Sequence, residues 1–334
     1  MNDHRKEQLS QWLSERLSIE TPKLQPVSGD ASFRRYFRVD YKSKVAKKTY
    51  IAVDAPPAYE NCEIFNRISK ILLSLDLNVP IVHEIDSENG FMLLSDLGDT
   101  LYLDQLDNNT SIHLYPLAIN AIVTMQSLPP SELHQIPTYD RQLLQDELQL
   151  FKDWFISRHL KLALSLQESK IVNDVFKELV DSALAQPQVF CHADFHSRNL
   201  MICETDTPGI IDFQDSVIGP ISFDLVSLLK DCYISWSREQ VEQWCQYYFD
   251  QATEKGIIKS SFSEFIHWFD LMGLHRHIRV LGIFTRLNYR DGKADYLNDL
   301  PLTFSYVIDT VERYPQFTEF AKLLKNRVQP KLLQ

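Results

Sequence analysis

Residues 192–215 read HADFHSRNLMICETDTPGIIDFQD, and this stretch indicates both the fold and the function of the chain. It contains two short apolar runs, 200–203 and 209–212, separated by the turn-forming residues ETDTP. Apolar runs on either side of such a turn predict a β-hairpin. A hairpin returns both of its ends to the same edge, so we expect polar side chains at the two ends to lie close together.

Three of those polar side chains carry amide or carboxylate oxygens. Asp194 lies on a predicted loop, Asn199 stands where the first run begins, and Asp212 stands where the second run ends. Taken alone, each would more often be a hydrogen-bonding residue of a turn. Together they form an oxygen-rich set suited to a hard divalent cation such as Mg²⁺, and such a cation is what phosphoryl transfer requires.

The spacing of these residues resembles a known pattern. H-x-D-x-x-x-x-N followed by I-D-F resembles the catalytic and metal-binding loops of the kinase superfamily, and HADFHSRNL is similar to the aminoglycoside phosphotransferase and choline kinase branch. This resemblance implies ATP and Mg²⁺ as cofactors. It implies that Asp194 engages the acceptor hydroxyl, while Asn199 and Asp212 bind the metal.

Residues around this loop are expected to support it. His192 and His196 are expected to brace backbone carbonyls and to transfer no proton. The resemblance implies that Asp224 braces the catalytic loop, and Ser222 is expected to cap the helix that follows. For Asp215, a role beside the metal and a role as a cap of the next turn remain equally open.

The flanking regions predict two lobes of different composition. An N-terminal helix (4–18) precedes the strand-like runs SFRRYFRV, TYIAVDA, IVHEID and GFMLLSD, with a helix (63–75) between the second and third runs. From residue 111 onward long amphipathic helices are expected, of which 139–166 is the clearest. We therefore predict an α+β, protein-kinase-like bilobal fold, with a small mixed β-sheet lobe and hinge (1–97) and a mainly helical lobe (98–334).

The nucleotide is expected to bind to the first lobe. The segment VSGDASFRRYFRV takes the place of the phosphate-covering loop of kinases, although it contains a single glycine. A plain hairpin with a polar turn is the alternative for this segment taken alone. In LLSDLGDTL, the resemblance implies an inter-lobe hinge whose backbone meets adenine; an ordinary turn is the alternative. The expected nucleotide-binding residues are Ser28, Gly29, Asp30, Ser32, Phe33, Arg34, Ser95, Asp96 and Leu97.

One position departs from the family pattern. Strand TYIAVDAPP has Val53 and Asp54 where the family supplies a phosphate-binding lysine. This departure puts the usual ion pair with Glu60 or Glu63 in doubt. It implies that an arginine of the upstream loop supplies the positive charge.

The acceptor site is expected in the second lobe. Arginines recur at helical spacing in HRHIRVLGIFTRLNYRDGKADYL, and Arg276 and Arg279 are the candidates for reading an anionic group of the substrate; pairing with surface carboxylates is the alternative. This stretch, with GDASFRRYFRV, DAPP and ELQLFKDWFISRHL, is similar to bacterial amino-sugar kinases of the same branch, in which C1 hydroxyls of N-acetylmuramate and N-acetylglucosamine are phosphorylated.

Other acceptors and another class of function remain open. Choline, homoserine or an aminoglycoside are alternative acceptors, and a cationic one would need acidic and aromatic residues such as those of the group Trp236, Trp244, Trp268 and Asp270. A non-catalytic nucleotide-binding regulator is the alternative of another class, favoured only by the absent lysine.

Composition restricts the partners. The formal net charge of −11 disfavours nucleic acid, which is bound through clustered Lys and Arg. The apolar runs are shorter than a membrane-spanning helix, and five cysteines without C-x-x-C spacing indicate reduced thiols. We therefore expect a cytoplasmic enzyme that acts on a small molecule.

Overall fold

The computed structural model describes residues 3–27, 33–42, 47–205 and 207–333. Contacts within the chain divide it into two compact units. Unit 1 comprises Met1–Tyr102 together with Asn199–Gln214, and unit 2 comprises Leu103–Arg198 together with Asp215–Gln334. The expected α+β class is confirmed, because sheet structure dominates unit 1 and helices dominate unit 2.

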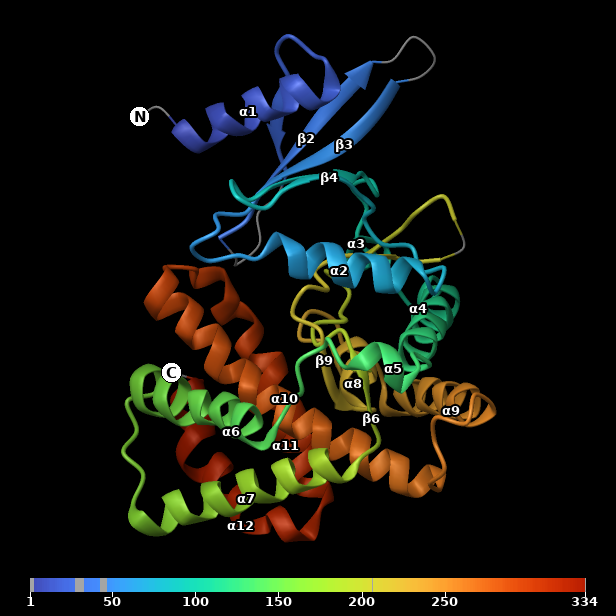
Figure 1. The fold of residues 1–334 in the computed structure, drawn as a ribbon. Helices are drawn as coiled ribbons and strands as arrows, with labels where there is room; N and C mark the ends of the chain where they lie inside the picture. The colour runs from blue at the N-terminus through green and yellow to red at the C-terminus, as the bar shows by residue number, and fades with distance from the viewer. Residues whose placement is uncertain (1–2, 28–32, 43–46, 206, 334) are drawn as a thin grey trace. The chain divides into compact units, whose positions relative to one another are not determined.

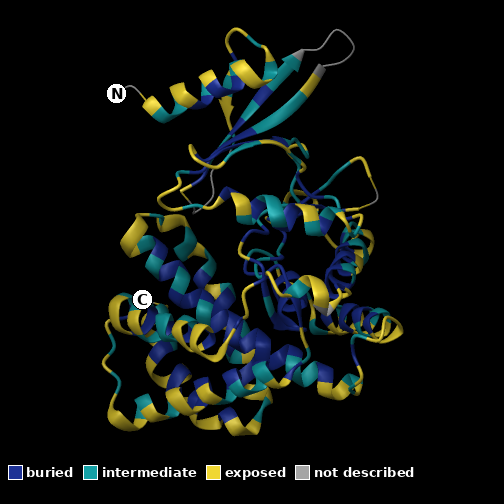
Figure 2. Ribbon diagram, in the orientation of Figure 1, coloured by how far each residue is buried: buried dark blue, intermediate teal, exposed yellow. Residues whose placement is uncertain are grey.

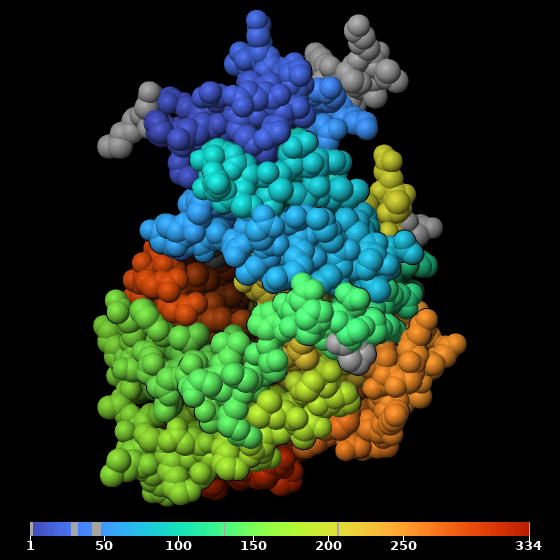
Figure 3. Space-filling view, viewed as in Figure 1, coloured from blue at the N-terminus to red at the C-terminus, as the bar shows by residue number. Residues whose placement is uncertain are grey.

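Unit 1 is built around a five-stranded antiparallel sheet in the order β1-β2-β3-β5-β4 (Figure 1). Its strands are β1 (Leu24–Pro26), β2 (Arg35–Lys42), β3 (Lys47–Asp54), β4 (Val82–Asp86) and β5 (Phe91–Ser95). The helix α2 (Cys62–Leu73) begins at Asn61, whose side chain accepts hydrogen bonds from the next turn, and it packs near β4 at the surface (Figure 3). The strand-like runs and the intervening helix were therefore predicted correctly.

The helix α1 (His4–Leu17) supplies a core for one face of this sheet. Leu9, Trp12 and Leu13 lie on its buried side, against alternate residues of the strands such as Phe37 and Ala52. Alternation follows from the two-residue period of a strand, which places every second side chain on the same face. Burial of this apolar surface fixes α1 to the sheet.

The predicted hairpin is present and belongs to unit 1. Its strands, β7 (Leu200–Met201) and β8 (Gly209–Ile210), pair antiparallel. Backbone hydrogen bonds attach it to earlier segments of the unit, from Ile202 to Thr100 and from Ile210 to Asn78. The segment 199–214 thus completes a unit whose other residues precede it by about a hundred positions.

Unit 2 is helical apart from one small sheet. The strands β6 (Gln188–Cys191) and β9 (Val217–Pro220) pair antiparallel. The longer helices are α4 (Ser111–Gln126), α6 (Arg141–Leu150), α7 (Leu166–Ala185), α9 (Arg238–Glu254), α10 (Phe262–Asp291) and α11 (Leu300–Arg313). The shorter elements are α3 (Tyr102–Gln105), α5 (Pro130–Leu133), η1 (Phe151–His159), α8 (Phe223–Leu229), η2 (Ala294–Asp299), η3 (Pro315–Phe317), α12 (Thr318–Leu323), η4 (Leu324–Val328) and α13 (Gln329–Leu332).

Helix α10 is the central element of unit 2. Its middle is buried on all sides, as the dark residues along the helix in Figure 2 show. It contacts α6, η1, α7, α8 and α11. Gly282 allows a close approach to the end of α6, since a Cβ there would lie 2.5 Å from the carbonyl carbon of Leu150.

The prediction of one helix over 139–166 was wrong. Helix α6 ends at Leu150, the π-helical segment η1 follows it, and Lys161 then takes a positive φ of 53°. The change of helix type occurs at Leu150 and Phe151, the residues that Gly282 approaches. Apolar periodicity indicates which face is buried, but it does not reveal where a crossing helix widens a turn.

No helix in the described part of the chain is long and apolar enough to cross a membrane.

Candidate active site

The loop that the sequence predicts to be catalytic follows strand β6 in unit 2. Cys191 pairs with Val217 of β9, so the loop leaves the small sheet at a fixed point. Ala193 has a φ of +75°, which is the left-handed region that a non-glycine residue rarely occupies. This conformation places Asp194 just after a tight reversal, where the side chain is partly exposed.

The buried carboxylate of Asp224 holds this reversal in place. It accepts hydrogen bonds from the backbone N–H groups of His192 (2.7 Å) and Ala193 (3.0 Å). Burial and the negative charge of Asp194 together raise the pKa of Asp224 to about 7, although the two N–H donors lower it. Asp224 thus contacts the loop backbone as the sequence predicted.

A second carboxylate holds the end of the same loop. Asp231 accepts hydrogen bonds from the backbone N–H (3.0 Å) and the hydroxyl (2.5 Å) of Ser197. His192 lies within the loop and accepts a hydrogen bond from the N–H of Asp194 through Nδ1 (3.2 Å). The ring of His196 lies edge-on to Tyr233, and burial lowers the pKa of His196.

The expected cap at Ser222 is not formed. Its hydroxyl donates to Gln186 Oε1 at 2.7 Å and makes no capping hydrogen bond to α8. The prediction of a side-chain cap was wrong because a buried glutamine competes for the hydroxyl. Asp215, which the sequence left open, is exposed in unit 2.

Arg276 on α10 is a buried cation beside these carboxylates. It is 3% exposed, and its guanidinium donates to Ser227 Oγ (2.9 Å) and Cys232 Sγ (3.3 Å). The negative charges of Asp231 and Asp194 help to keep its pKa above the ordinary value although burial opposes this. Pairing with a surface carboxylate therefore does not describe Arg276.

Arg279 lies one helical turn further along α10. Its Nε forms an ion pair with Glu147 at 3.0 Å, and its guanidinium lies over the ring of Phe223. Glu147 also accepts a hydrogen bond from the hydroxyl of Tyr139. Burial raises the pKa of Glu147, and the charge of Asp194 adds to the rise, whereas Arg279 opposes it.

Contacts within unit 2 link this group to the catalytic loop. The ring of Tyr139 stacks on Phe223, with centroids 5.3 Å apart, and Phe223 immediately precedes Asp224. Tyr139 also donates its backbone N–H to Ile218 of β9 at 2.8 Å. We use "acceptor group" below for Tyr139, Glu147 and Arg279.

The metal candidates Asn199 and Asp212 lie together in unit 1. Asn199 Nδ2 is 3.5 Å from Asp212 Oδ2, and Asp212 Oδ1 accepts a hydrogen bond from Gln214 at 2.8 Å. Asp212 has a φ of +64°, a second non-glycine residue in the left-handed region. Such strained positions concentrate at functional sites.

This pair fits a magnesium ion. Mg²⁺ prefers oxygen ligands and commonly takes only one or two from the protein, the rest coming from water and phosphate. Asp212 offers a carboxylate, and a flip of the Asn199 amide presents its oxygen in place of its nitrogen. In the described parts of the chain, no three His, Cys, Asp or Glu side chains group as a metal site.

Arg34 connects the same region to the loop before α2. Its Nη2 lies 2.5 Å from Glu60 Oε2, and its Nη1 lies 3.9 Å from Asp212 Oδ1. The side chain of Arg34 is 8% exposed. Glu60, whose usual ion pair the sequence put in doubt, therefore pairs with an arginine.

The remaining nucleotide candidates are only partly described. Ser28, Gly29, Asp30 and Ser32 lie outside the described residues. Phe33 is exposed and stacks on Tyr59, with centroids 4.3 Å apart.

At the expected hinge, Ser95 exchanges two hydrogen bonds of 2.9 Å with Ile81, through its N–H and its hydroxyl. Asp96 accepts hydrogen bonds from Arg38 (2.6 and 3.0 Å) and from the N–H of Gly98, while the carbonyl of Leu97 faces Cys203 Sγ at 3.7 Å. The side chain of Ser95 is thus held by the backbone of Ile81, and that of Asp96 by Arg38 of β2 and the turn at Gly98.

Three residues that contact this region were not singled out in the sequence. Tyr139 and Glu147 lie in the predicted helix 139–166, which was examined only for its apolar face, and Asp231 follows α8. The available signal was Glu147 within the quoted segment ELQLFKDWFISRHL, a carboxylate beside buried leucines. Only the tertiary contact with Arg279 distinguishes it from a surface residue.

The arrangement defines a phosphotransferase of kinase type. The chain belongs to the phosphotransferase enzyme family, whose pattern it matches over residues 23–257. The N-acetylmuramate/N-acetylglucosamine kinase of Pseudomonas putida is 40% identical to it, over 97% of this chain and 96% of the relative. The resemblance stated from the sequence is therefore confirmed.

Solved structures of low sequence identity share the fold. The Plasmodium vivax ethanolamine kinase has a TM-score of 0.66 at 15% identity, covering 95% of this chain and 89% of the other. An ADP-bound aminoglycoside phosphotransferase, APH(2'')-Ib, has a TM-score of 0.57 at 13% identity, covering 93% and 99%.

Proposed function

We propose that the chain transfers the γ-phosphoryl group of ATP, with Mg²⁺, to the anomeric hydroxyl of N-acetylmuramate and N-acetylglucosamine in cell-wall sugar recycling. The observation that carries the catalytic part is the left-handed reversal at Ala193, which Asp224 stabilises and which presents Asp194. The acceptor is supported by the 40% identity to the kinase of Pseudomonas putida named for these two sugars. The proposal includes a cytoplasmic location, where ATP is available.

Each polar group has a defined task in this reaction. Asp194 orients the acceptor hydroxyl and takes its proton as the new P–O bond forms; the bond between the γ-phosphorus and the β–γ bridging oxygen of ATP breaks, and ADP leaves. Asn199 and Asp212 would hold Mg²⁺, which supplies neutralisation of phosphate charge when bound. The hinge backbone at Ser95–Leu97 would meet adenine.

The acceptor group explains how a carboxylated sugar could be read. Glu147 is the only carboxylate paired with Arg279 among the residues that the structure describes. A guanidinium has five N–H donors, so Arg279 retains donors for a second acceptor. We assign it to the lactyl carboxylate of N-acetylmuramate, and Arg276, which is buried with Ser227 and Cys232, to charge balance in the loop.

A cationic acceptor such as choline is poorly supported by the alternative cluster. Its carboxylate, Asp270, is 1% exposed and already pairs with Lys230 (2.9 Å), Arg238 (2.7 Å) and Arg313 (3.5 Å). Those cations hold the pKa of Asp270 far below its ordinary value, although burial opposes them. A further cation would meet net positive charge there.

A coupled assay of ADP release over a panel of acceptors tests the proposal. We expect turnover with N-acetylmuramate and N-acetylglucosamine and none with choline, homoserine or kanamycin. Turnover confined to another acceptor would reject the two sugars. The position of the phosphate is then read by ³¹P NMR, where an anomeric phosphate shows coupling to H1.

The catalytic role is tested by substitution. Asp194→Ala should lower kcat by at least about a thousandfold, the usual scale for loss of a group that orients and deprotonates the nucleophile. Asp174→Ala is the matched control, because Asp174 is 63% exposed on α7 and pairs only with Lys170 in the described structure. Near-normal turnover of Asp194→Ala with an unchanged melting temperature would remove Asp194 from this role.

A further inference from the structure

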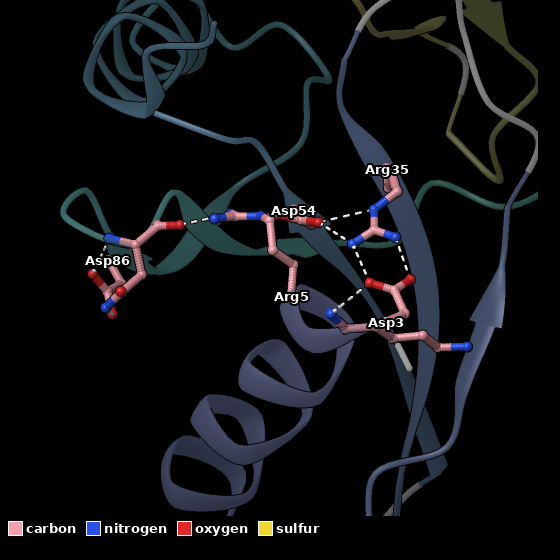
Figure 4. Close-up of polar contacts among 7 residues, drawn as sticks. Asp3, Arg5, Arg35, Asp54 and Asp86 are labelled. Atoms are coloured by element: carbon pink, nitrogen blue, oxygen red, sulfur yellow. Dashed lines mark hydrogen bonds and ion pairs between the residues drawn. The ribbon is translucent and has the colours of Figure 1, made fainter. Parts of the chain in front are cut away.

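The ATP phosphates require a cation, and β3 has Val53 and Asp54 at the place where the family pattern has a lysine. Asp54 ends this strand, and its carboxylate is fully buried. Arg5 of α1 donates to Oδ1 at 2.8 and 2.5 Å, and Arg35 of β2 donates to Oδ2 at 2.9 and 2.5 Å (Figure 4). Both oxygens of Asp54 are thus occupied by arginines of the same unit.

Arg35 is thereby committed to a structural task. Its guanidinium also pairs with Asp3, the residue that caps α1 by accepting a hydrogen bond from the N–H of Lys6. Arg35 therefore ties the start of β2 to both α1 and the end of β3. Two carboxylates surround its charge, and none of that charge is left for a phosphate.

Arg34 points the other way because successive residues of an extended chain face opposite sides. It lies against Glu60 and near Asp212, whereas Arg35 lies against Asp54 and Asp3. The neighbouring residues Phe33 and Tyr59 stack on each other, so two consecutive contacts join the loop before β2 to the loop before α2. The Asp54 cluster and this stack together fix the direction of Arg34.

We propose that Arg34 is the phosphate-binding cation of this enzyme, and that Arg5, Asp54 and Arg35 act as positioning residues that hold it beside Asp212. A guanidinium is suited to this place because one nitrogen keeps the pair with Glu60 while others bind a phosphate oxygen. The α1 helix thus has a role in nucleotide binding although it touches no nucleotide. This inference rests on the proposed function only for ATP as the donor.

Nucleotide binding without an acceptor tests the assignment. Isothermal titration calorimetry would compare ADP and AMP, each with and without Mg²⁺, on the wild-type chain and on Arg34→Gln. We expect ADP to bind the variant about ten- to a hundredfold more weakly, the range for loss of a charge-assisted contact, while AMP binding changes by less than about threefold. Arg16→Gln is the matched control, since Arg16 is 52% exposed on α1, and its ADP affinity should not change.

A merely structural role for Arg34 predicts a different outcome. Arg34→Gln would then lower the melting temperature and weaken ADP and AMP equally, and that result, or unchanged ADP affinity in a folded variant, overturns the assignment. Arg34→Lys, which keeps the charge, should recover part of the ADP affinity, and it replaces the glutamine variant if the latter does not fold. Failure of every sugar to be phosphorylated would reject the proposed acceptors and leave these binding results unaffected.

The positioning part is tested by Arg5→Gln. Arg5 acts on Arg34 only through Asp54 and Arg35. Its loss should therefore weaken ADP binding by about two- to tenfold and AMP binding by less. Free guanidinium in solution should not restore the ADP affinity of Arg5→Gln, whereas Arg5→Lys should keep part of the wild-type ADP affinity. Identical affinities of Arg5→Gln and the wild-type chain for ADP would remove the cluster from this role.

Discussion

Replacement of Asp224 by asparagine should separate stability from activity. The folded pKa of Asp224 is about 7 against an ordinary value of 3.8, so the folded chain holds this proton more tightly than the unfolded chain does. Ionisation of Asp224 therefore opposes folding. The stability that the bound proton contributes is lost as the pH rises from about 4 to about 7. The full loss is roughly 4 kcal/mol, at about 1.4 kcal/mol for each tenfold change.

The asparagine variant has no such proton. Between pH 5.5 and pH 8, the free energy of unfolding of the wild-type chain should fall by about 2 kcal/mol relative to that of Asp224→Asn, because about half of the span between the unfolded and folded pKa values of Asp224 lies above pH 5.5. Guanidinium denaturation at the two pH values measures this difference. Asp174→Asn on the exposed face of α7 controls for loss of a carboxylate as such.

The activity of Asp224→Asn should be lower than that of the wild-type chain, although its stability lacks the loss at high pH. The amide of asparagine has one oxygen for the two N–H groups of His192 and Ala193, and loss of one charge-assisted bond costs about 1.5 to 3 kcal/mol. The turn at Ala193 is then less populated, so kcat should fall about ten- to a hundredfold even at pH 8. Wild-type kcat together with a wild-type pH dependence of stability would refute the assigned role of Asp224.

Three further outcomes are expected. Arg279→Gln should raise KM for N-acetylmuramate about tenfold or more while leaving KM for N-acetylglucosamine within about threefold, and equal effects on both sugars in the ADP-release assay would contradict the reading of a carboxylate. Gly282→Ala should lower the free energy of unfolding by about 1 to 3 kcal/mol, because the new Cβ meets the backbone of Leu150, and an unchanged denaturation midpoint would show that α10 can shift without cost. Asp231→Asn should lower kcat and leave KM for ATP unchanged, since the contacts of Asp231 are with Ser197 in the catalytic loop; a rise of that KM alone would argue against this.

Local sequence patterns were sufficient for much of the fold. The alternation in SFRRYFRV and TYIAVDA and the turn in ETDTP predict β2, β3 and the β7–β8 hairpin, because each is set by residues close together in sequence. The same is true of the α2 helix. The change from α- to π-helix after Leu150 lies instead where Gly282, 132 positions further along the chain, approaches the backbone, and no local pattern contains this contact.

For the candidate site, the sequence predicts residues but not their contacts. The family spacing predicts roles for Asp194, Asn199, Asp212 and Asp224, and the departure at Asp54 predicts that an arginine serves in place of a lysine. Which arginine serves depends on carboxylates at positions 3, 54 and 60, which the sheet and α1 bring to opposite sides of the chain. The roles proposed for Glu147 and Arg279 likewise depend on their ion pair, which no local sequence pattern predicts.

The discontinuity of unit 1 has a consequence for biosynthesis. The hairpin donates backbone hydrogen bonds from Ile202 to Thr100 and from Ile210 to Asn78, so those acceptors leave the ribosome about 100 and about 130 residues before their donors. At the usual pace of roughly 5–20 residues per second, Thr100 and Asn78 wait on the order of 5–25 s for the hairpin. Expression of residues 1–102 alone would leave both carbonyls without these donors, so the excised fragment should be less stable than unit 1.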